Sequence, residues 1–278
     1  MKKYILLIVI LLCIFLTTYY KSNKKAVPSN VPVLRIGAEC DYVPNSWEES
    51  KPSAYNVPIV NSEASYAEGY DIQIAKIVAR ELNVELEVRK FAWNDLIPAL
   101  NSGDIDAVFS SMLDTEERKK LVAFSESYEM RPTEYAIIVD SVSPYITATR
   151  LEDFNGARII GEDGTKLDDV IDQIPGAIHM KPVDKMQSMI DFVLQDKADG
   201  AVIDTDAGYY YEMMNKNLTM VRFKGDNGFK LGFTGVCAAV RKSDTELLHK
   251  MNIAIGHISR NERQRIMDAV NSRMMEVR

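Results

Sequence analysis

Apolar residues recur along this chain with two different spacings, and these spacings alternate. The segment VLRIGAE (residues 33–39) has the composition of a strand, and apolar residues at helical spacing then predict a helix over residues 71–82. The strand VELEVRKF (84–91) and a short buried strand within IDAVFSSM (105–112) follow. This order of strand, helix and strand predicts an α/β sheet with parallel neighbours.

The same alternation recurs in the second half of the body. Strands are predicted in ARIIG (157–161) and GAVID (200–204), with helices over residues 166–174 and 186–195. The stretches LNSGDIDAVFSS and LQDKADGAVIDT also resemble each other, with Asp106 corresponding to Asp199. The sequence therefore predicts two similar α/β lobes.

Two extended stretches, residues 134–140 and 230–240, are suited to cross between the lobes. Crossing twice makes the first lobe discontinuous, with residues 33–136 and 236–278 in lobe 1 and residues 137–235 in lobe 2. Ligands of open α/β sheets lie beyond the carboxyl ends of the strands, so we expect a ligand in the cleft between the lobes. A long polar segment without periodicity, residues 40–69, follows the first strand, and structureless insertions of this length are usually functional.

The N-terminus determines the compartment. Residues Tyr4 to Tyr20 form one uncharged, mostly apolar run behind Lys2 and Lys3, which is typical of an export signal or a membrane anchor. We therefore assign residues 1–25 to a signal or anchor segment and residues 26–32 to a tether. Cleavage, lipidation at Cys13 and retention as an uncleaved anchor stay open, and each places the body outside the cytoplasm.

Charge and composition exclude several classes of function. The chain of 278 residues carries a formal net charge of −7. Because five lysines and no acid lie in the first 25 residues, residues 26–278 carry 28 basic and 40 acidic side chains, a net charge of −12. A body this acidic, without a cluster of Lys and Arg, is not expected to bind nucleic acid.

Cysteine and histidine usage predicts neither a metal site nor a cofactor. Only Cys40 and Cys237 remain in the body, enough for at most one disulfide, and two unpaired apolar residues are an equal alternative. The three histidines have no metal-ligand spacing with any cysteine or acid.

The residues that follow the predicted strands are complementary to an α-amino acid. Arg118 can grip a carboxylate through two parallel hydrogen bonds, and Asp204 can accept an ammonium group. The backbone N–H groups around Thr165, at a predicted helix start, favour negative charge. Each residue also has a purely structural interpretation: Arg118 would lie on a solvated helix face, and Thr165 would only cap a helix. The other candidates at these strand ends are Glu39, Tyr42, Trp47, Ser110 and Ser111.

The stretch from Gly69 to Tyr128 resembles a known family. Its W-x-x-L-I-P-A-L segment, its D-A-x-x-S-S-M strand and its T-x-E-R-K-x-x-x-F-S-x-x-Y segment are similar, in order and spacing, to those of the bacterial solute-binding proteins of family 3. These extracytoplasmic proteins deliver polar amino acids to ABC transporters. The resemblance continues through EDGT, ADGAVID and GVCAAVRKSDTELL and covers nearly all of residues 33–270. It implies the two-lobed, type II periplasmic-binding-protein fold.

By matching position, the resemblance implies a role for each candidate. Arg118 would bind the α-carboxylate with Thr165 and the Ser111 region, and Asp204 would bind the α-amino group. Tyr42 and Tyr70 would pack on the ligand's side chain.

The resemblance also bears on the choice of ligand. Glu39 would face a polar or cationic side chain, which favours arginine or lysine, with glutamine next. Two positions depart from the family pattern: Leu113 stands where a Thr or Ser is usual, and Asn45 stands where an aromatic often follows the proline, with Trp47 as its substitute.

The function implied is capture of an amino acid by closure of the two lobes, followed by delivery to an ABC transporter permease. The protein would act as a monomer, without catalysis. Two alternatives stay open. One is a sensory module that reports an amino acid to a partner, and the other is an enzyme similar to the cyclohexadienyl or arogenate dehydratases, with Glu39 or Asp41 as general acid.

Overall fold

Two five-stranded sheets form the framework of the protein in the computed structural model, which describes residues 31–129, 133–232 and 235–276. The first sheet has the order β6-β1-β7-β14-β8. Its strands are β1 (Val33–Ala38), β6 (Glu85–Lys90), β7 (Ala107–Val108), β8 (Ala123–Ser127) and β14 (Cys237–Val240). β1 is parallel to β6 and β7, whereas β14 is antiparallel to its neighbours.

The second sheet repeats this arrangement with the order β11-β10-β12-β9-β13. Its strands are β9 (Tyr135–Asp140), β10 (Arg158–Ile160), β11 (Ile178–His179), β12 (Gly200–Asp204) and β13 (Leu218–Val221). β10 is parallel to β11 and β12, whereas β9 is antiparallel to β12 and β13. Mixed sheets of this kind, flanked by helices, confirm the predicted α/β class.

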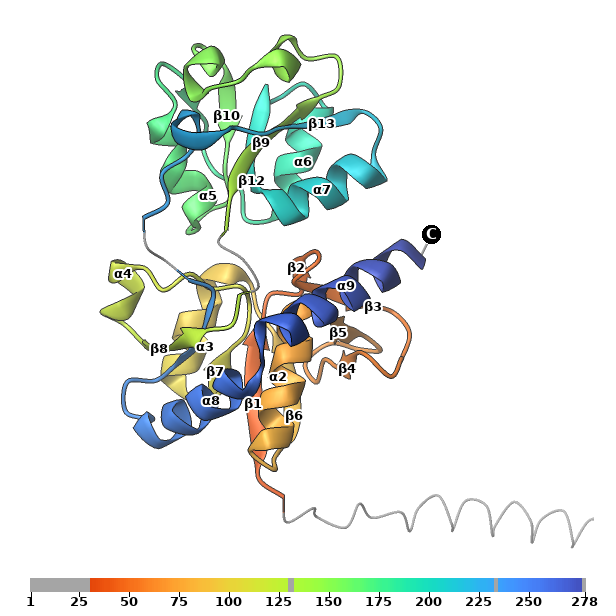
Figure 1. Ribbon diagram of the computed structural model, residues 1–278, viewed down its shortest axis with the longest axis vertical. Coiled ribbons are helices and arrows are strands. Elements are labelled where there is room, and N and C mark those ends of the chain that lie inside the picture. Colours follow the sequence, from red (N-terminus) through yellow and green to blue (C-terminus); the bar gives the residue numbers. More distant parts are fainter. Residues whose placement is uncertain (1–30, 130–132, 233–234, 277–278) are drawn as a thin grey trace, which may run out of the picture. The chain divides into compact units, whose positions relative to one another are not determined.

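Helices surround each sheet in a lobe of its own (Figure 1). The first lobe holds α2 (Tyr70–Glu81), α3 (Leu96–Ser102), α4 (Glu116–Lys119), α8 (Thr245–His257) and α9 (Arg260–Glu276). The second lobe holds α5 (Lys166–Asp169), α6 (Met186–Leu194) and α7 (Thr205–Met214). Short 3₁₀ helices join them: η1 (Trp93–Asp95), η2 (Pro144–Thr147), η3 (Leu151–Phe154), η4 (Val170–Gln173) and η5 (Gly225–Asn227).

Each lobe has its own hydrophobic core. In α2, Ile74 and Val78 are fully buried because their helical spacing turns them toward the first sheet, as the sequence pattern predicts. The second core is built from residues between Ala136 and Val221. Strand β14 joins the first sheet after the second sheet is complete, so the chain enters the first lobe twice. The limits of lobe 1 at 33–136 and 236–278, and of lobe 2 at 137–235, stay predictions.

The polar segment after β1 is not structureless, contrary to expectation. It forms a small antiparallel sheet of β2 (Asp41–Tyr42), β3 (Ser46–Glu49), β5 (Tyr66–Glu68) and β4 (Val57–Pro58). Strands of two to four residues are too short to show an alternating pattern, so periodicity could not reveal them. The helix predicted over residues 166–174 is divided between α5 and the 3₁₀ helix η4.

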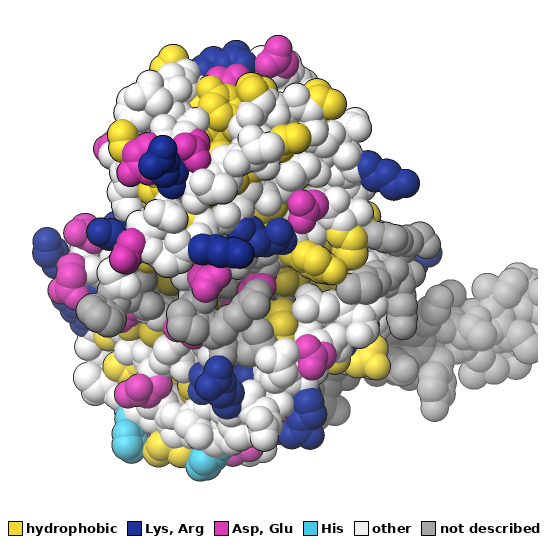
Figure 2. Space-filling view, turned by 45° about the horizontal axis from the view of Figure 1, so that its top comes forward, with side chains coloured by type: hydrophobic (Ala, Val, Ile, Leu, Met, Phe, Trp, Pro, Cys, Tyr) yellow, Lys and Arg dark blue, Asp and Glu magenta, His cyan; other side chains and the backbone are white. Residues whose placement is uncertain are grey.

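The predicted N-terminal segments, residues 1–25 and 26–32, lie outside the described residues except for Val31 and Pro32. No helix in the described part of the chain is long and apolar enough to span a membrane. On the face of the protein shown in Figure 2, basic and acidic side chains are intermingled.

The similarity between residues 100–111 and 194–205 has a structural basis in two matching ion pairs. Arg35 on β1 donates to both oxygens of Asp106, from Nε at 2.9 Å and Nη2 at 2.7 Å. Arg158 on β10 contacts Asp199 in the same way, at 3.2 and 2.7 Å. Each aspartate also accepts the backbone N–H of its arginine. Asp106 and Asp199 therefore correspond in the structure, each lying one residue before β7 or β12, whereas laying the two stretches together without a gap sets Asp106 opposite Gly200.

Replacing Asp199 with alanine is expected to lower the free energy of unfolding by about 1–2 kcal/mol, because the backbone N–H and the guanidinium of Arg158 both lose an acceptor. Asp196 offers a matched control: its side chain is 95% exposed and contacts the same guanidinium at 3.1 Å. Asp196→Asn, which removes the charge and suits the left-handed backbone at this position (φ 53°), should cost less than about 0.5 kcal/mol, as exposed ion pairs do. Urea denaturation of both variants measures the difference, and equal losses would contradict this account.

Candidate functional site

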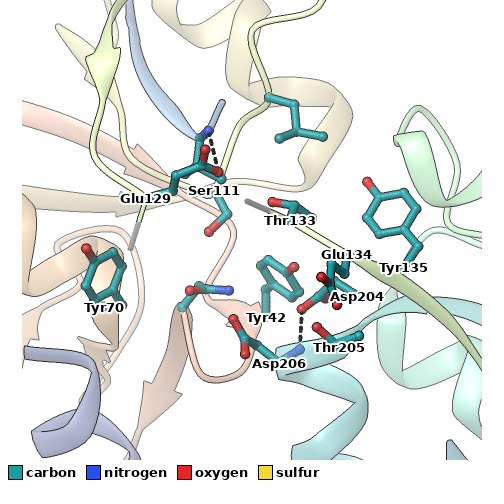
Figure 3. A pocket seen from close by; sticks show the side chains of 13 residues that line it. Tyr42, Tyr70, Ser111, Glu129, Thr133, Glu134, Tyr135, Asp204, Thr205 and Asp206 are labelled. Atoms are coloured by element: carbon teal, nitrogen blue, oxygen red, sulfur yellow. Dashed lines mark hydrogen bonds between the residues drawn. The ribbon is translucent and has the colours of Figure 1, made fainter. Parts of the chain in front are cut away.

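Two adjoining cavities lie where elements of the two lobes meet. We call the first the Arg118 cavity; its lining includes Trp93, Leu113, Arg118, Tyr135, Glu162 and Thr165, together with Glu39, Tyr42, Ser110 and Ser111. We call the second the Asp204 cavity; its lining includes Asn45, Tyr70, Glu129, Glu134, Tyr135, Asp204 and Asp206, together with Tyr42 and Ser111 (Figure 3). Tyr42, Ser111 and Tyr135 line both cavities, so the two adjoin.

Arg118 is a half-buried cation whose hydrogen-bond partners are neutral. It lies in the short helix α4, which Thr115 caps by accepting the N–H of Arg118. Its guanidinium donates to the carbonyl oxygens of Leu113 at 3.0 Å and Gly164 at 3.1 Å, and it lies 4.9 Å from the centre of a ring of Trp93. None of the ion pairs among the described residues involves it, and burial lowers the pKa of Arg118. This guanidinium is therefore suited to an anion such as a carboxylate.

Asp204 is a buried acid with one oxygen left over. It ends β12 and caps α7, where Oδ1 accepts the N–H groups of Asp206 and Ala207, each at 3.0 Å (Figure 3). Oδ2 is buried and has no partner of adequate hydrogen-bond geometry among the described residues, although the phenol of Tyr42 lies close enough to interact with the carboxyl. Burial raises the pKa of Asp204 to about 6. A buried carboxylate oxygen of this kind is an acceptor for an ammonium group.

Glu39 and Glu162 bring two carboxyl groups together from opposite lobes. Glu39 follows β1, Glu162 follows β10, and both side chains line the Arg118 cavity, close enough for each carboxyl to shift the pKa of the other. Both residues are buried, at 7% and 5% exposure. Burial, followed by nearby negative charge, raises the pKa of both Glu39 and Glu162 well above the usual range of a glutamate. Two buried carboxyl groups in one cavity do not readily ionise together, so this pair favours a bound proton.

The hydroxyl groups that were predicted to assist Arg118 have partners within the protein. Ser110 accepts the backbone N–H of Glu39 at 3.0 Å and so positions that residue. Ser111, in the left-handed region with φ of 49°, donates to the buried carboxyl of Asp71 at 3.0 Å. Thr165 caps α5 and donates to the carbonyl of Glu162. All three still line the Arg118 cavity.

The structure separates the predicted aromatic residues. Tyr42 lines both cavities, and Tyr70 lines the Asp204 cavity while its hydroxyl donates to the carbonyl of Tyr128 at 2.8 Å. Trp47 lines neither cavity; its Nε1 donates to Glu49 at 2.8 Å. Sequence reasoning missed Trp93, which covers Arg118, and Tyr135. Trp93 was visible in the family-like W-x-x-L-I-P-A-L segment, but its partner Arg118 lies 25 positions later.

Three hydrogen bonds connect the lobes beside the Arg118 cavity. Besides Arg118, Trp93 donates from Nε1 to the carbonyl of Gly164 at 2.9 Å. Asn94 donates to the carboxylate of Asp163 at 2.7 Å. The turn after β10 needs glycine here because Gly164 has φ of 71°, and a Cβ at this position would lie 2.1 Å from Oδ1 of Asn94.

The open question on the cysteines has an answer in the structure. Cys40 and Cys237 are both buried and free, so the disulfide alternative is not realised. Within residues 31–276, apart from the undescribed gaps, no group of three or more His, Cys, Asp and Glu side chains is arranged to hold a metal ion.

Similarity to known proteins agrees with this geometry. The arginine-binding extracellular protein ArtP of Bacillus subtilis is 28% identical over 268 residues, covering 94% of each chain. The L-arginine-binding protein of Pseudomonas aeruginosa is 26% identical, covering 82% of this chain and 83% of its own. Among solved structures, a mutant of ArgBP from T. maritima has a TM-score of 0.70 at 26% identity and covers 86% of this chain and 95% of its own.

The family profile of the bacterial extracellular solute-binding proteins, family 3, matches residues 34–269. This match confirms the family that the motifs indicated, the two-lobed fold, and the expectation of a binding protein and not an enzyme. The chain belongs to the bacterial extracellular solute-binding proteins of family 3.

Proposed function

We propose that this protein captures an amino acid with a cationic side chain outside the cytoplasm and presents it to the permease of an ABC transporter. The observation that carries the proposal is the set of charges at the two cavities. Among the described residues, Arg118 offers a cation without an acidic partner, Asp204 offers an oxygen without a hydrogen-bond donor of adequate geometry, and Glu39 and Glu162 offer further negative charge. A basic amino acid carries the complementary carboxylate, ammonium and side-chain cation.

The relatives support the same choice. Two proteins that are similar to this chain over most of its length are named as arginine-binding proteins. The structure of an ancestral arginine-binding protein, which has the same fold and is 26% identical, was solved with glutamine bound. Glutamine remains the alternative ligand, because the protonated acid pair can donate to or accept from a carboxamide. The net negative charge of the body favours a cationic ligand such as arginine or lysine over neutral glutamine.

Binding is proposed to favour the closed arrangement of the lobes. Arg118 and Glu39 belong to the first lobe, whereas Glu162 and Asp204 belong to the second. A ligand held by groups from both lobes binds better when they are close together, and only this difference in affinity shifts the equilibrium toward closure.

The N-terminal residues 1–25 are proposed to hold the protein at the outer face of the cytoplasmic membrane as an uncleaved anchor. The body would act there as a monomer beside its permease. The position outside the cytoplasm accords with the extracellular family to which the chain belongs.

A thermal-shift screen of the full chain against the twenty common amino acids tests the ligand class. Arginine and lysine are expected to raise the melting temperature most, since a ligand at a hundred times its Kd adds about 2.7 kcal/mol of stability. Agmatine, which lacks the α-carboxylate of arginine, is the matched control and should give little shift. A larger shift by aspartate or glutamate than by any basic amino acid would overturn the proposal.

A further inference from the structure

Glu39 comes from the first lobe and Glu162 from the second, and their carboxyl groups lie in the same cavity, which the cationic side chain of a ligand would enter. Glu39 directly follows β1, Glu162 lies two residues after the end of β10, and both side chains line the Arg118 cavity. Ser110 holds the backbone of Glu39 in place, and Thr165 holds that of Glu162. The two carboxyl groups therefore meet on supported backbone at the edge of the cavity.

Charged groups packed around the pair do not neutralise it. Asp41 on β2 adds negative charge, and Lys90 on β6 and Lys185 before α6 add positive charge. Lys90 also forms an ion pair with Glu48, and Asp41 lies near Asp184. The net effect of burial and these neighbours favours a protonated pair at neutral pH.

Tyr211 on α7 lies close enough to Glu162 for an electrostatic interaction, but its neutral phenol adds no positive charge. The nearby unpartnered Oδ2 of Asp204 is a second buried acid atom at the adjoining cavity. Glu162 and Asp204 therefore have no cation of their own among these neighbours, which suits a positively charged ligand.

We propose that the proton shared by Glu39 and Glu162 leaves when the cationic side chain of the ligand enters, so that ligand capture is coupled to release of one proton. This inference rests on the proposed function. The cation takes the place of the proton between two carboxylates, and the proton passes to solvent. Acidic conditions keep the proton on the pair and so compete with the ligand, whereas at higher pH the ionised carboxylates repel each other and attract the cation.

The sign of the pH dependence follows from this exchange. Because the pair holds a proton without ligand and none with a cation between its carboxylates, affinity rises with pH. Because burial and nearby negative charge raise the pKa values of both Glu39 and Glu162 well above the usual range of a glutamate, the pair keeps a proton at neutral pH. We expect the affinity for arginine to rise about tenfold per pH unit between pH 7 and 8, the linkage slope for one released proton.

Isothermal titration calorimetry of the full chain with arginine, in phosphate and in Tris at pH 7.5, counts the protons. Wild type is expected to release about one proton per arginine. Glu162→Gln keeps the shape of the side chain but cannot share a proton as an acid, so release should fall to near zero and the pH slope should flatten. Glu39→Gln should do the same. Glu246→Gln, which removes an exposed acid on α8 outside both cavities, should keep both.

The outcomes separate this inference from the proposed function. Arginine binding without proton release, or equal release by wild type and Glu162→Gln, would overturn the coupling and leave the capture of basic amino acids intact. Failure of both arginine and lysine to bind would overturn both. Circular dichroism of each variant establishes that it is folded.

Discussion

Arg118→Ala is expected to lower the affinity for arginine by about a hundredfold to a few thousandfold. Truncating one partner of a buried, hydrogen-bonded charge pair costs about 3–5 kcal/mol, and each 1.4 kcal/mol is a factor of ten. The reason is geometric. Nη1 and Nη2 each donate one hydrogen bond to a carbonyl oxygen, and the guanidinium keeps further N–H groups that can donate two parallel hydrogen bonds to a ligand carboxylate. Calorimetry at pH 7.5 measures the loss.

Two further variants sharpen this test. Arg118→Lys keeps the charge but loses the planar fork, so it should restore only part of the affinity. Lys119→Ala is the matched control on the same helix, because Lys119 is exposed and pairs with Asp114 and Glu116. Its affinity should equal that of wild type. Undiminished affinity in Arg118→Ala would exclude Arg118 from the binding of the carboxylate.

The framework of the fold could be predicted from local pattern. Helix α2 was predicted over residues 71–82 and is formed by Tyr70–Glu81, because its apolar positions are evenly spaced on one face. Strand β12 was predicted at residues 200–204 and is formed by those residues, since all five are buried and the segment reads as one apolar run ending in Asp204. Long, regular elements carry this information within themselves.

Contacts between distant residues could not be predicted in the same way. Glu162 was noticed only as part of the EDGT turn, since nothing near it in sequence shows that it meets Glu39 from the other lobe. Trp47 was predicted to contact the ligand because it follows the first strand and could substitute for the aromatic expected at the position of Asn45. The antiparallel pairing of β2 and β3 instead sets Trp47 opposite Asp41, and neither cavity is lined by its ring. The contact between the lobes therefore decides where Glu162 lies, and the register of β2 and β3 decides where Trp47 lies.

Leu113 illustrates a departure that the structure makes understandable. A hydroxyl is usual at its position in the family, but here the carbonyl of Leu113 accepts from Arg118 while its side chain lines both cavities. The backbone therefore positions the guanidinium, and an apolar side chain lies where a hydrogen bond was expected. This makes Arg118 the main candidate to hold the carboxylate.

Asp204→Asn is expected to lower the affinity for arginine by about a hundredfold or more while leaving the protein as stable as wild type or more stable. An amide can still cap α7 through its oxygen, but its NH₂ group would face an ammonium group, so the attraction of the charge is lost. Because burial raises the pKa of Asp204 to about 6, keeping this carboxylate ionised at pH 7.5 costs folding free energy, and a neutral amide removes that cost.

Asp153→Asn is the matched control for this test, since Asp153 also accepts backbone N–H groups, those of Thr149 and Arg150, but lies on η3 outside both cavities. Its affinity for arginine should be that of wild type. Calorimetry and thermal unfolding at pH 7.5 measure both properties of each variant. If Asp204→Asn keeps its affinity, the ammonium group is bound elsewhere; if it loses affinity and stability together, the carboxylate serves the fold and not the ligand.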